Sequence, residues 1–294
     1  MMTDLPAEQV RTLLAVVDEG TFDAAAAALH VTPSAVSQRV KALEQRTGRV
    51  LLQRTKPVRP TESGAVLVRF ARQLVRLERD AWGELGLSGA GEPTRVSVAV
   101  NADSLATWFL PALTRVEGLC FELHREDEDH TAALLREGLV MAAVTSSPDP
   151  VPGCTVRPLG RMRYLPVAAP GFPAGRLHGP LPEALPRAPV VVFDRKDDFQ
   201  DDFVRRLGGG SAGPDRHYVP TSEGFCDAVA AGLGWGMVPE VQAAPLLDAG
   251  RLVLLTPGKW MDVALYWQQW RLDSPALAAL ADAVTATATE ALRQ

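Results

Sequence analysis

The 294-residue sequence is poor in cysteine, in histidine and in long apolar runs. Its three cysteines, Cys120, Cys154 and Cys226, are odd in number and far apart, which predicts reduced thiols and excludes a disulfide framework. The five histidines show no metal-ligand spacing. No apolar run approaches membrane-spanning length, and no basic segment followed by an apolar run indicates a secretory signal. We therefore expect a cytoplasmic protein with no membrane contact, no metal and no cofactor.

Signatures of nucleotide-binding enzymes are also missing. The chain has no Gly-Lys-Ser or Gly-Lys-Thr loop of the kind that cradles phosphates. The stretch GLGWG at residues 232–236 lacks the strand-to-helix context of a dinucleotide site, so we interpret it as a turn. We therefore predict that the protein is not an enzyme.

Charge is unevenly distributed along the chain, although its formal sum is only −5. Residues 39–59 carry seven Lys or Arg and a single acidic side chain, Glu44. Residues 91–294 instead carry 18 basic and 25 acidic side chains. A basic island on an acidic protein predicts a local anionic partner.

The stretch TFDAAAAALHVTPSAVSQRV, from Thr21 to Val40, predicts two helices joined by a short break. Thr21 can cap an alanine helix whose lack of bulk lets a neighbouring helix approach closely. Thr32 can cap the next helix, with Pro33 at its first position and Gly48 at its end. The pattern is typical of a helix-turn-helix motif.

One face of the second helix is polar without being strongly charged. On a helical wheel the apolar side holds Val36, Val40 and Leu43. The opposite side holds Ser34, Ser37, Gln38, Lys41 and Gln45. An ordinary solvated face favours Glu and Lys, whereas hydroxyls, amides and one ammonium suit base edges and phosphates in a DNA major groove. The predicted DNA-binding residues of the motif are Thr32, Ser34, Ala35, Ser37, Gln38 and Lys41.

The next segment, GRVLLQRTKPVRPTESG at 48–64, alternates apolar and basic positions between prolines, which is typical of a small wing. Its cations would contact phosphates without reading sequence. They are Arg49, Arg54, Lys56 and Arg59.

Residues 62–85 predict one long helix. Spacings of three and four residues, typical of a coiled-coil seam, separate Leu67, Phe70, Leu74, Leu77 and Ala81. Packing of this helix against its own domain is the alternative. Gly83, Gly86, Gly89 and Gly91 then predict a flexible hinge.

Beyond residue 93 short apolar segments alternate with helical ones. Strands are expected in RVSVAV, CFELH, LVMAAVT, YLPVAA, PVVVF, HYVP, GWGMVP and DVALYWQQW. Helices are expected near residues 131–137, 197–207, 222–231 and 275–292. This alternation predicts an α/β fold with parallel sheets.

The stretches LLAVVDEGTFDAAAAALHVTPSAVSQRVKALEQRTG and RTKPVRPTESG, the long helix, and AGLGWGMVPE together resemble the LysR-type transcriptional regulators. The resemblance implies a winged helix-turn-helix at 1–61, a dimerising linker helix and hinge at 62–92, and a two-lobed effector domain at 93–294. The lobes would resemble type 2 periplasmic binding proteins, with 93–163 and 265–294 in the first and 164–264 in the second. It also implies a homodimer or homotetramer that binds double-stranded promoter DNA, a small-molecule effector and RNA polymerase.

A narrower resemblance, to the LysG or ArgP regulators of basic amino-acid export, rests on NADSLATWFLPAL, VFDRKDDFQDDF and LTPGKWMDVALYWQQW. Met141 departs from the wider family, which often has an acidic residue there. The resemblance implies an activator that responds to lysine or arginine and controls an exporter gene. Two alternatives stay open: a regulator for another molecule such as a carboxylate, and an amino-acid-binding protein or enzyme on the same two-lobed fold.

A ligand of such a fold sits between the lobes, at strand ends and helix N-termini. The polar residues expected there are Asp103, Ser104, Thr145, Ser146, Thr221, Ser222 and Glu223. N–H groups at the helix starts suit an α-carboxylate, although Ser and Thr also act as plain helix caps.

Acidic residues follow the strand that ends at Phe193. Asp194, Asp197 and Asp198 could pair with the cationic group of lysine or arginine, with Asp194 favoured because it lies nearest the strand end. The alternative is an acidic first turn that complements a helix dipole. We expect Asp201 and Asp202 to be solvated, and REDED at 125–129 to be an exposed loop.

Overall fold

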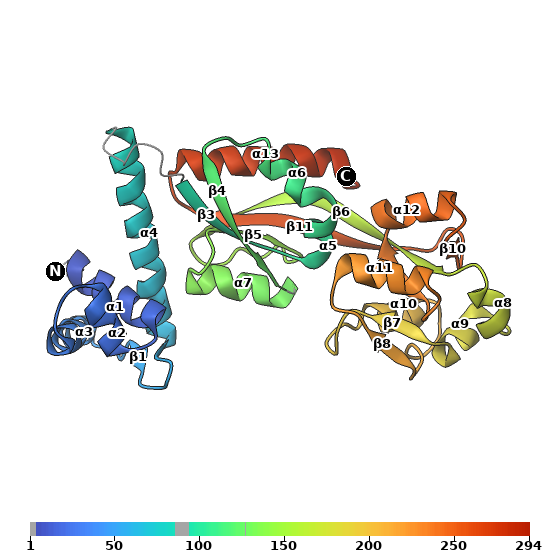
Figure 1. The fold of residues 1–294 in the computed structure, drawn as a ribbon, viewed down its shortest axis with the longest axis horizontal. Helices are drawn as coiled ribbons and strands as arrows, with labels where there is room; N and C mark the ends of the chain where they lie inside the picture. The colour runs from blue at the N-terminus through green and yellow to red at the C-terminus, as the bar shows by residue number, and fades with distance from the viewer. Residues whose placement is uncertain (1–3, 86–93, 127) are drawn as a thin grey trace.

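The computed structural model describes residues 4–85, 94–126 and 128–294. Of the predicted hinge glycines, Gly86, Gly89 and Gly91 lie outside the described residues. A small helical domain is joined by one long helix to a larger two-lobed α/β domain (Figure 1). Within the described ranges, no helix combines the length and the apolar character needed to cross a bilayer.

Three helices of the N-terminal domain pack around a small apolar core: α1 (Ala7–Glu19), α2 (Phe22–Ala28) and α3 (Pro33–Thr47). The Thr21 hydroxyl accepts a hydrogen bond from the Ala24 N–H at 3.1 Å, and the Thr32 hydroxyl accepts one from the Ala35 N–H at 3.2 Å. Both predicted N-caps are therefore confirmed. The buried Ala25 contributes so little bulk that α2 packs closely on both neighbouring helices.

A short antiparallel hairpin forms the wing, in which β1 (Leu52–Gln53) pairs with β2 (Arg59–Pro60). The Thr61 hydroxyl then caps the next helix by accepting from the Gly64 N–H at 3.0 Å. A Cβ on Gly64 would lie 1.9 Å from the Leu51 carbonyl oxygen, so only glycine permits this close approach of helix and wing.

The helix that follows, α4 (Glu62–Glu84), stands beside the larger domain (Figure 1). Three of its arginines donate to backbone carbonyls there: Arg69 to Arg136 at 3.4 Å, Arg72 to Glu137 at 3.1 Å, and Arg76 to Arg95 at 3.0 Å. Of the predicted seam residues, Leu67 packs on the N-terminal core, whereas Phe70 and Leu77 are 38% and 42% exposed. The dimer seam stays a prediction.

A seven-stranded sheet runs through the larger domain in the order β10-β6-β11-β5-β3-β4, with β9 paired to β6. Its strands are β3 (Thr94–Val100), β4 (Leu119–Arg125), β5 (Ala142–Thr145), β6 (Cys154–Ala168), β9 (Gly236–Pro239), β10 (Val253–Leu254) and β11 (Met261–Trp270). β3 is parallel to β4 and β5, whereas β6 and β11 are antiparallel to all their partners. The prediction of parallel sheets is thus wrong for the long strands, because the chain returns through the other lobe before it pairs.

β6 and β11 extend from one lobe into the other and connect them (Figure 1). The predicted lobe boundaries at 163/164 and 264/265 fall inside these two strands. In the first lobe, α13 packs on β6 and β11, and α7 packs on β3 and β5. The helical segments of this lobe are α5 (Ala102–Ser104), a π-helical turn (Leu105–Phe109), α6 (Leu110–Leu113), α7 (Glu128–Glu137) and α13 (Pro275–Ala291).

The second lobe contains a parallel strand pair, β7 (Val190–Val192) and β8 (Arg216–Tyr218), beside the ends of the long strands. Its helices are α8 (Phe172–Arg176), α9 (Leu181–Ala184), α10 (Phe199–Arg206), α11 (Ser222–Ala230) and α12 (Glu240–Asp248). The buried ring of Trp235 packs near Phe203 of α10, with ring centroids 6.1 Å apart. This packing holds α10 against the segment that leads into β9.

Candidate functional site

The polar face of α3 is turned to solvent. Ser34, Ser37, Gln38 and Lys41 are exposed, while Ala35 is half-buried. The opposite face carries the buried side chains of Val36, Val40 and Leu43. Thr32 lies at the exposed start of the helix and caps it. The helix therefore offers hydroxyl, amide and ammonium groups on one accessible surface, as DNA base reading requires.

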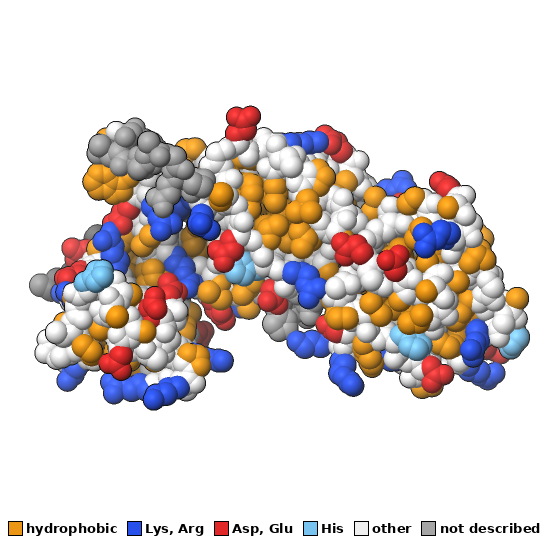
Figure 2. Space-filling view, viewed as in Figure 1, with side chains coloured by type: hydrophobic (Ala, Val, Ile, Leu, Met, Phe, Trp, Pro, Cys, Tyr) orange, Lys and Arg blue, Asp and Glu red, His pale blue; other side chains and the backbone are white. Residues whose placement is uncertain are grey.

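The wing carries exposed cations that lack an ion-pair partner among the described residues. Arg49, Arg54, Lys56 and Arg59 are exposed, and none of them forms an ion pair within the described part of the chain. Arg39 differs, since it pairs with Glu8 at 2.5 Å. Figure 2 shows Lys and Arg side chains along the lower edge of the N-terminal domain. Unpaired exposed cations can neutralise phosphates without first breaking an intramolecular pair.

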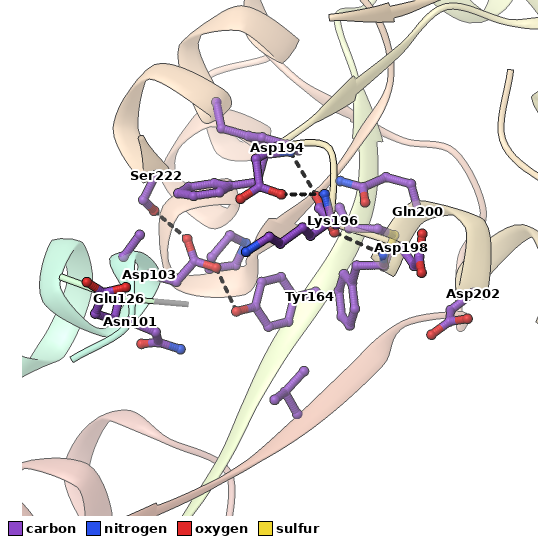
Figure 3. A pocket seen from close by; sticks show the side chains of 18 residues that line it. Asn101, Asp103, Glu126, Tyr164, Asp194, Lys196, Asp198, Gln200, Asp202 and Ser222 are labelled. Carbon is purple, nitrogen blue, oxygen red and sulfur yellow. Dashed lines mark hydrogen bonds between the residues drawn. The ribbon is translucent and has the colours of Figure 1, made fainter. Parts of the chain in front are cut away.

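A cavity of about 480 Å³ lies between the lobes (Figure 3). Its described lining is rich in carboxylates: Asp103, Glu126, Asp194, Asp197, Asp198 and Asp202. Lys196 is the one basic residue among the described lining residues. The other lining residues include Asn101, Tyr164, Phe193, Phe199, Gln200, Ser222, Phe225 and Met237. The volume and the mixture of aromatic and acidic groups suit a small, polar, cationic ligand.

Asp103 joins the two lobes at one end of this cavity. Its carboxylate accepts hydrogen bonds from the Tyr164 hydroxyl at 2.7 Å and from the Ser222 hydroxyl at 2.6 Å. Burial raises the pKa of Asp103 above its ordinary value of 3.8, although these two hydrogen bonds oppose the shift. Asn101 positions this helix start, because its side chain accepts from the Ser104 N–H at 3.0 Å.

The loop between β7 and α10 supplies three of the carboxylates that line the cavity. The Asp197 carboxylate accepts from the Phe193 N–H at 2.8 Å and from the Phe199 N–H at 3.0 Å, so it holds the loop in shape. Burial raises its pKa, and the two N–H donors oppose that shift. Asp194 accepts only from the Lys196 N–H, at 2.7 Å, among the described groups, and Asp198 is exposed.

Several residues predicted for the effector site are not among the described lining residues. Ser104 is fully buried behind Asp103, and Thr145 is buried in β5, where it accepts from the Gln268 side chain at 3.2 Å. Thr221 and Glu223 flank Ser222 but are exposed. Ser146 is half-buried beyond the end of β5. The cavity thus brings together Asp103, Asp194, Asp197, Asp198 and Ser222 from the predicted set.

The expectation that Asp201 is solvated is wrong. Asp201 is 5% exposed, and it accepts from two nitrogens of Arg216 at 2.7 and 3.0 Å and from the Ala212 N–H at 2.7 Å. Burial alone would raise the pKa of Asp201, but these donors hold it below its ordinary value. Asp202 is half-exposed and pairs with Arg205 one turn later.

The expectation of an exposed loop at 125–129 is wrong in its extent, and for Glu126 also in its exposure. Arg125 ends β4, and α7 begins at Glu128. Glu126 is half-buried and lines the cavity. The loop prediction failed because a run of charges looks alike in a solvated turn and beside a ligand cavity.

Sequence reasoning also missed Tyr164 and Gln200. Tyr164 lies on β6 and meets Asp103 only through tertiary folding. Gln200 is 2% exposed on α10, and its side-chain oxygen has no partner within the described residues. Tyr164 opens the expected strand YLPVAA and belongs to no motif, so only the alternation of inward and outward positions along that strand could have suggested it. Gln200 lies within VFDRKDDFQDDF, but the acidic residues around it drew the prediction instead.

Two arrangements that enzymes use can be compared with the described part of the chain. No group of three or more His, Cys, Asp or Glu is placed there to hold a metal ion. The segment GGSAG at 209–213 has the spacing of a nucleophile elbow, but it follows α10 and precedes β8. An elbow requires the reverse order, strand before helix.

Two family models match the chain. Residues 7–65 match the bacterial regulatory helix-turn-helix protein, lysR family, and residues 89–289 match the LysR substrate binding domain. The lysine export transcriptional regulatory protein LysG of Corynebacterium glutamicum is 47% identical over 97% of this chain and 98% of its own length.

Solved structures of two relatives have the same fold as this chain. The crystal structure of ArgP from Mycobacterium tuberculosis is 47% identical, covers 99% of each chain and has a TM-score of 0.93. Full-length LysG from Corynebacterium glutamicum with bound effector Arg is 45% identical, covers 99% of this chain and 100% of that one, and has a TM-score of 0.87. The relatives are transcription regulators, which agrees with the prediction that the chain is not an enzyme. Since the substrate-binding model alone covers more than half of the sequence, this chain belongs to the LysR family of bacterial helix-turn-helix regulators.

Proposed function

We propose that this protein binds double-stranded promoter DNA through α3 and the wing, and that lysine or arginine in the cavity between the lobes controls its activity. The observation that carries the effector class is the charge of the cavity: six carboxylates face one ammonium among the described lining residues. Such a cavity attracts a ligand of net positive charge and repels a dicarboxylate.

The ligand would be held at both ends. Asp194 is half-buried on the β7–α10 loop and accepts one internal hydrogen bond where Asp197 accepts two, so it would pair with the side-chain ammonium or guanidinium. The start of α11 would hold the α-carboxylate, because the Thr221 side chain makes no cap hydrogen bond and leaves the first N–H groups available. The relative from Corynebacterium glutamicum with bound effector Arg supports a basic amino acid as the effector.

We further propose that the regulated gene encodes an amino-acid exporter and that the protein acts in the cytoplasm as a homodimer or homotetramer with RNA polymerase. The exporter rests on the name of the relative, a lysine export regulator. The oligomer rests on the exposed apolar side chains of α4, namely Phe70, Leu77 and Trp82. RNA polymerase rests on the family alone.

A band-shift titration tests the proposal that the protein binds promoter DNA under the control of lysine or arginine. The protein should bind the DNA upstream of the neighbouring genes more tightly than random DNA, and lysine or arginine should change the mobility or affinity of the complex. A protein that binds lysine without binding any DNA would instead be a solute-binding protein. A response to dicarboxylates with none to basic amino acids would identify the other class of effector.

A further inference from the structure

The Asp103 carboxylate, at one end of the cavity, has two hydroxyl donors and no ion-pair partner among the described residues. One of its oxygens accepts from the Tyr164 hydroxyl at 2.7 Å, and the other accepts from the Ser222 hydroxyl at 2.6 Å (Figure 3). Lys196 is the one basic residue of the described lining, and its exposed side chain forms no ion pair with Asp103. This end of the cavity therefore carries a negative charge that the described residues do not neutralise.

The surroundings of Asp103 favour binding of a cation. Burial raises the pKa of its carboxyl group, the hydroxyls of Ser222 and Tyr164 oppose that rise, and repulsion by the Glu223 carboxylate adds to it. A carboxylate offers about four lone-pair positions on its two oxygens, so each Asp103 oxygen can accept one further hydrogen bond. Asp103 is half-buried and lines the cavity, so a ligand can reach these positions.

An amino acid whose α-carboxylate binds at the start of α11 brings its α-ammonium close to Asp103. Ser222 is the first residue of α11, and its hydroxyl is bonded to the Asp103 carboxylate, so the helix start and the carboxylate are adjacent. The α-ammonium and the α-carboxylate of an amino acid are attached to the same carbon atom. The three N–H donors of the ammonium match the open acceptor positions of a carboxylate.

We propose that Asp103 binds the α-ammonium of the effector and thereby selects α-amino acids over ligands that carry only a terminal amine. This inference rests on the proposed basic amino-acid effector. Asp194 would pair with the side-chain cation and Asp103 with the α-ammonium, so each positive charge of lysine or arginine meets its own carboxylate. A ligand without the α-ammonium leaves the Asp103 carboxylate desolvated and unpaired, which weakens its binding.

The alternative role for Asp103 is that of a purely structural link between the lobes through its bond to Ser222. A structural link that does not touch the ligand affects all ligands of the cavity alike. An ion pair with the α-ammonium affects only the ligands that carry this group. The compound ε-aminocaproate, which is lysine without its α-ammonium, separates the two roles.

Calorimetry of wild type, Asp103→Asn and Glu126→Gln with lysine and ε-aminocaproate tests the proposal. Wild type should bind lysine about ten- to hundredfold more tightly than ε-aminocaproate. Asparagine keeps the shape of the side chain and removes its charge. Asp103→Asn should therefore bind lysine about ten- to hundredfold more weakly than wild type, while its affinity for ε-aminocaproate stays within about threefold.

Glu126→Gln is the matched control, because it removes another half-buried carboxylate from the lining of the same cavity. This variant should keep the wild-type preference for lysine over ε-aminocaproate. An equal loss of preference in Glu126→Gln would show that the net charge of the cavity separates the two ligands, which overturns the role of Asp103.

Wild type that binds ε-aminocaproate as tightly as lysine overturns the proposal without any variant. Equal losses of both ligands in Asp103→Asn would identify the structural link, and unchanged lysine binding by this variant would remove Asp103 from the site. If wild type binds neither lysine nor arginine, the proposed effector class fails and this inference fails with it.

Discussion

The Ser222 hydroxyl donates a hydrogen bond of 2.6 Å to the Asp103 carboxylate, and the two residues come from opposite lobes of the effector domain. Arg125 of the first lobe adds a second contact by donating to the Pro220 carbonyl oxygen at 2.6 Å. The two lobes therefore meet through polar groups next to the cavity. A ligand that binds in the cavity can break or strengthen these two hydrogen bonds between the lobes. Ligand binding would then change how the two lobes are positioned relative to each other.

Asp103→Asn should change how stability depends on pH. A carboxyl group whose pKa is raised in the folded state stabilises the fold fully below its unfolded value of 3.8, and that contribution is lost as pH rises through the raised pKa. Asparagine stays neutral, so the variant has no such loss. The free energy of unfolding of the variant minus that of wild type should therefore be larger at pH 7 than at pH 4. Urea unfolding at the two pH values measures the difference. A difference that does not vary with pH contradicts the assigned shift.

Asp201→Ala should destabilise the second lobe by about 2–4 kcal/mol, because it leaves the Arg216 guanidinium and the Ala212 N–H without their acceptor. Asp202→Ala is the matched control, since it removes only a half-exposed pair with Arg205 and should cost less than about 1 kcal/mol. Urea unfolding of both variants provides the test. Equal losses in the two variants would show that the buried pair has no special role.

Gln38→Ala should weaken binding to the cognate site by about 1–3 kcal/mol and leave random DNA nearly unaffected, because we propose that its exposed amide on α3 reads bases. Arg54→Ala is the contrasting variant. It should weaken cognate and random DNA alike and reduce the salt slope by about 1. Fluorescence anisotropy at several salt concentrations separates the two effects. Full cognate affinity in Gln38→Ala would refute the proposed docking of α3.

Leu77→Glu should dissociate the proposed oligomer. Leu77 is 42% exposed on α4 and lies in the predicted seam, so a carboxylate there would be buried only in the assembled form. Sedimentation velocity should detect monomers. Arg79→Glu, an exposed change on the same helix outside the predicted seam, is the control and should keep the wild-type oligomer. If Leu77→Glu sediments like wild type, α4 does not form the interface.

The N-terminal domain could be predicted because its signals are local. Thr21, Thr32 and Gly48 mark helix ends through their own side chains or backbone freedom, and the structure has all three at the expected helix ends. The polar face of α3 needs only helical periodicity. No distant residue has to be known for these inferences.

The cavity was harder to predict because its members meet only in three dimensions. Asp194 could be chosen from its place after a strand, but Tyr164 and Glu126 reach the same space from β6 and the end of β4. For Asp201 the prediction failed in a different way, since a side chain expected to be solvated is buried. Its burial depends on Arg216, fifteen residues away, and nothing in the local pattern distinguishes it from Asp202.

The most direct test of the account is calorimetric titration of wild type and Asp194→Asn with lysine, arginine, leucine and glutamate. Asparagine keeps the shape and the acceptor for the Lys196 N–H while it removes the charge. Wild type should prefer lysine or arginine, and the variant should lose about 1.5–3 kcal/mol of that binding. DNA binding without ligand should be unchanged, because Asp194 lies outside the N-terminal domain. Wild-type preference for leucine or glutamate would contradict the basic amino-acid effector, and undiminished lysine binding by Asp194→Asn would remove that residue from the site.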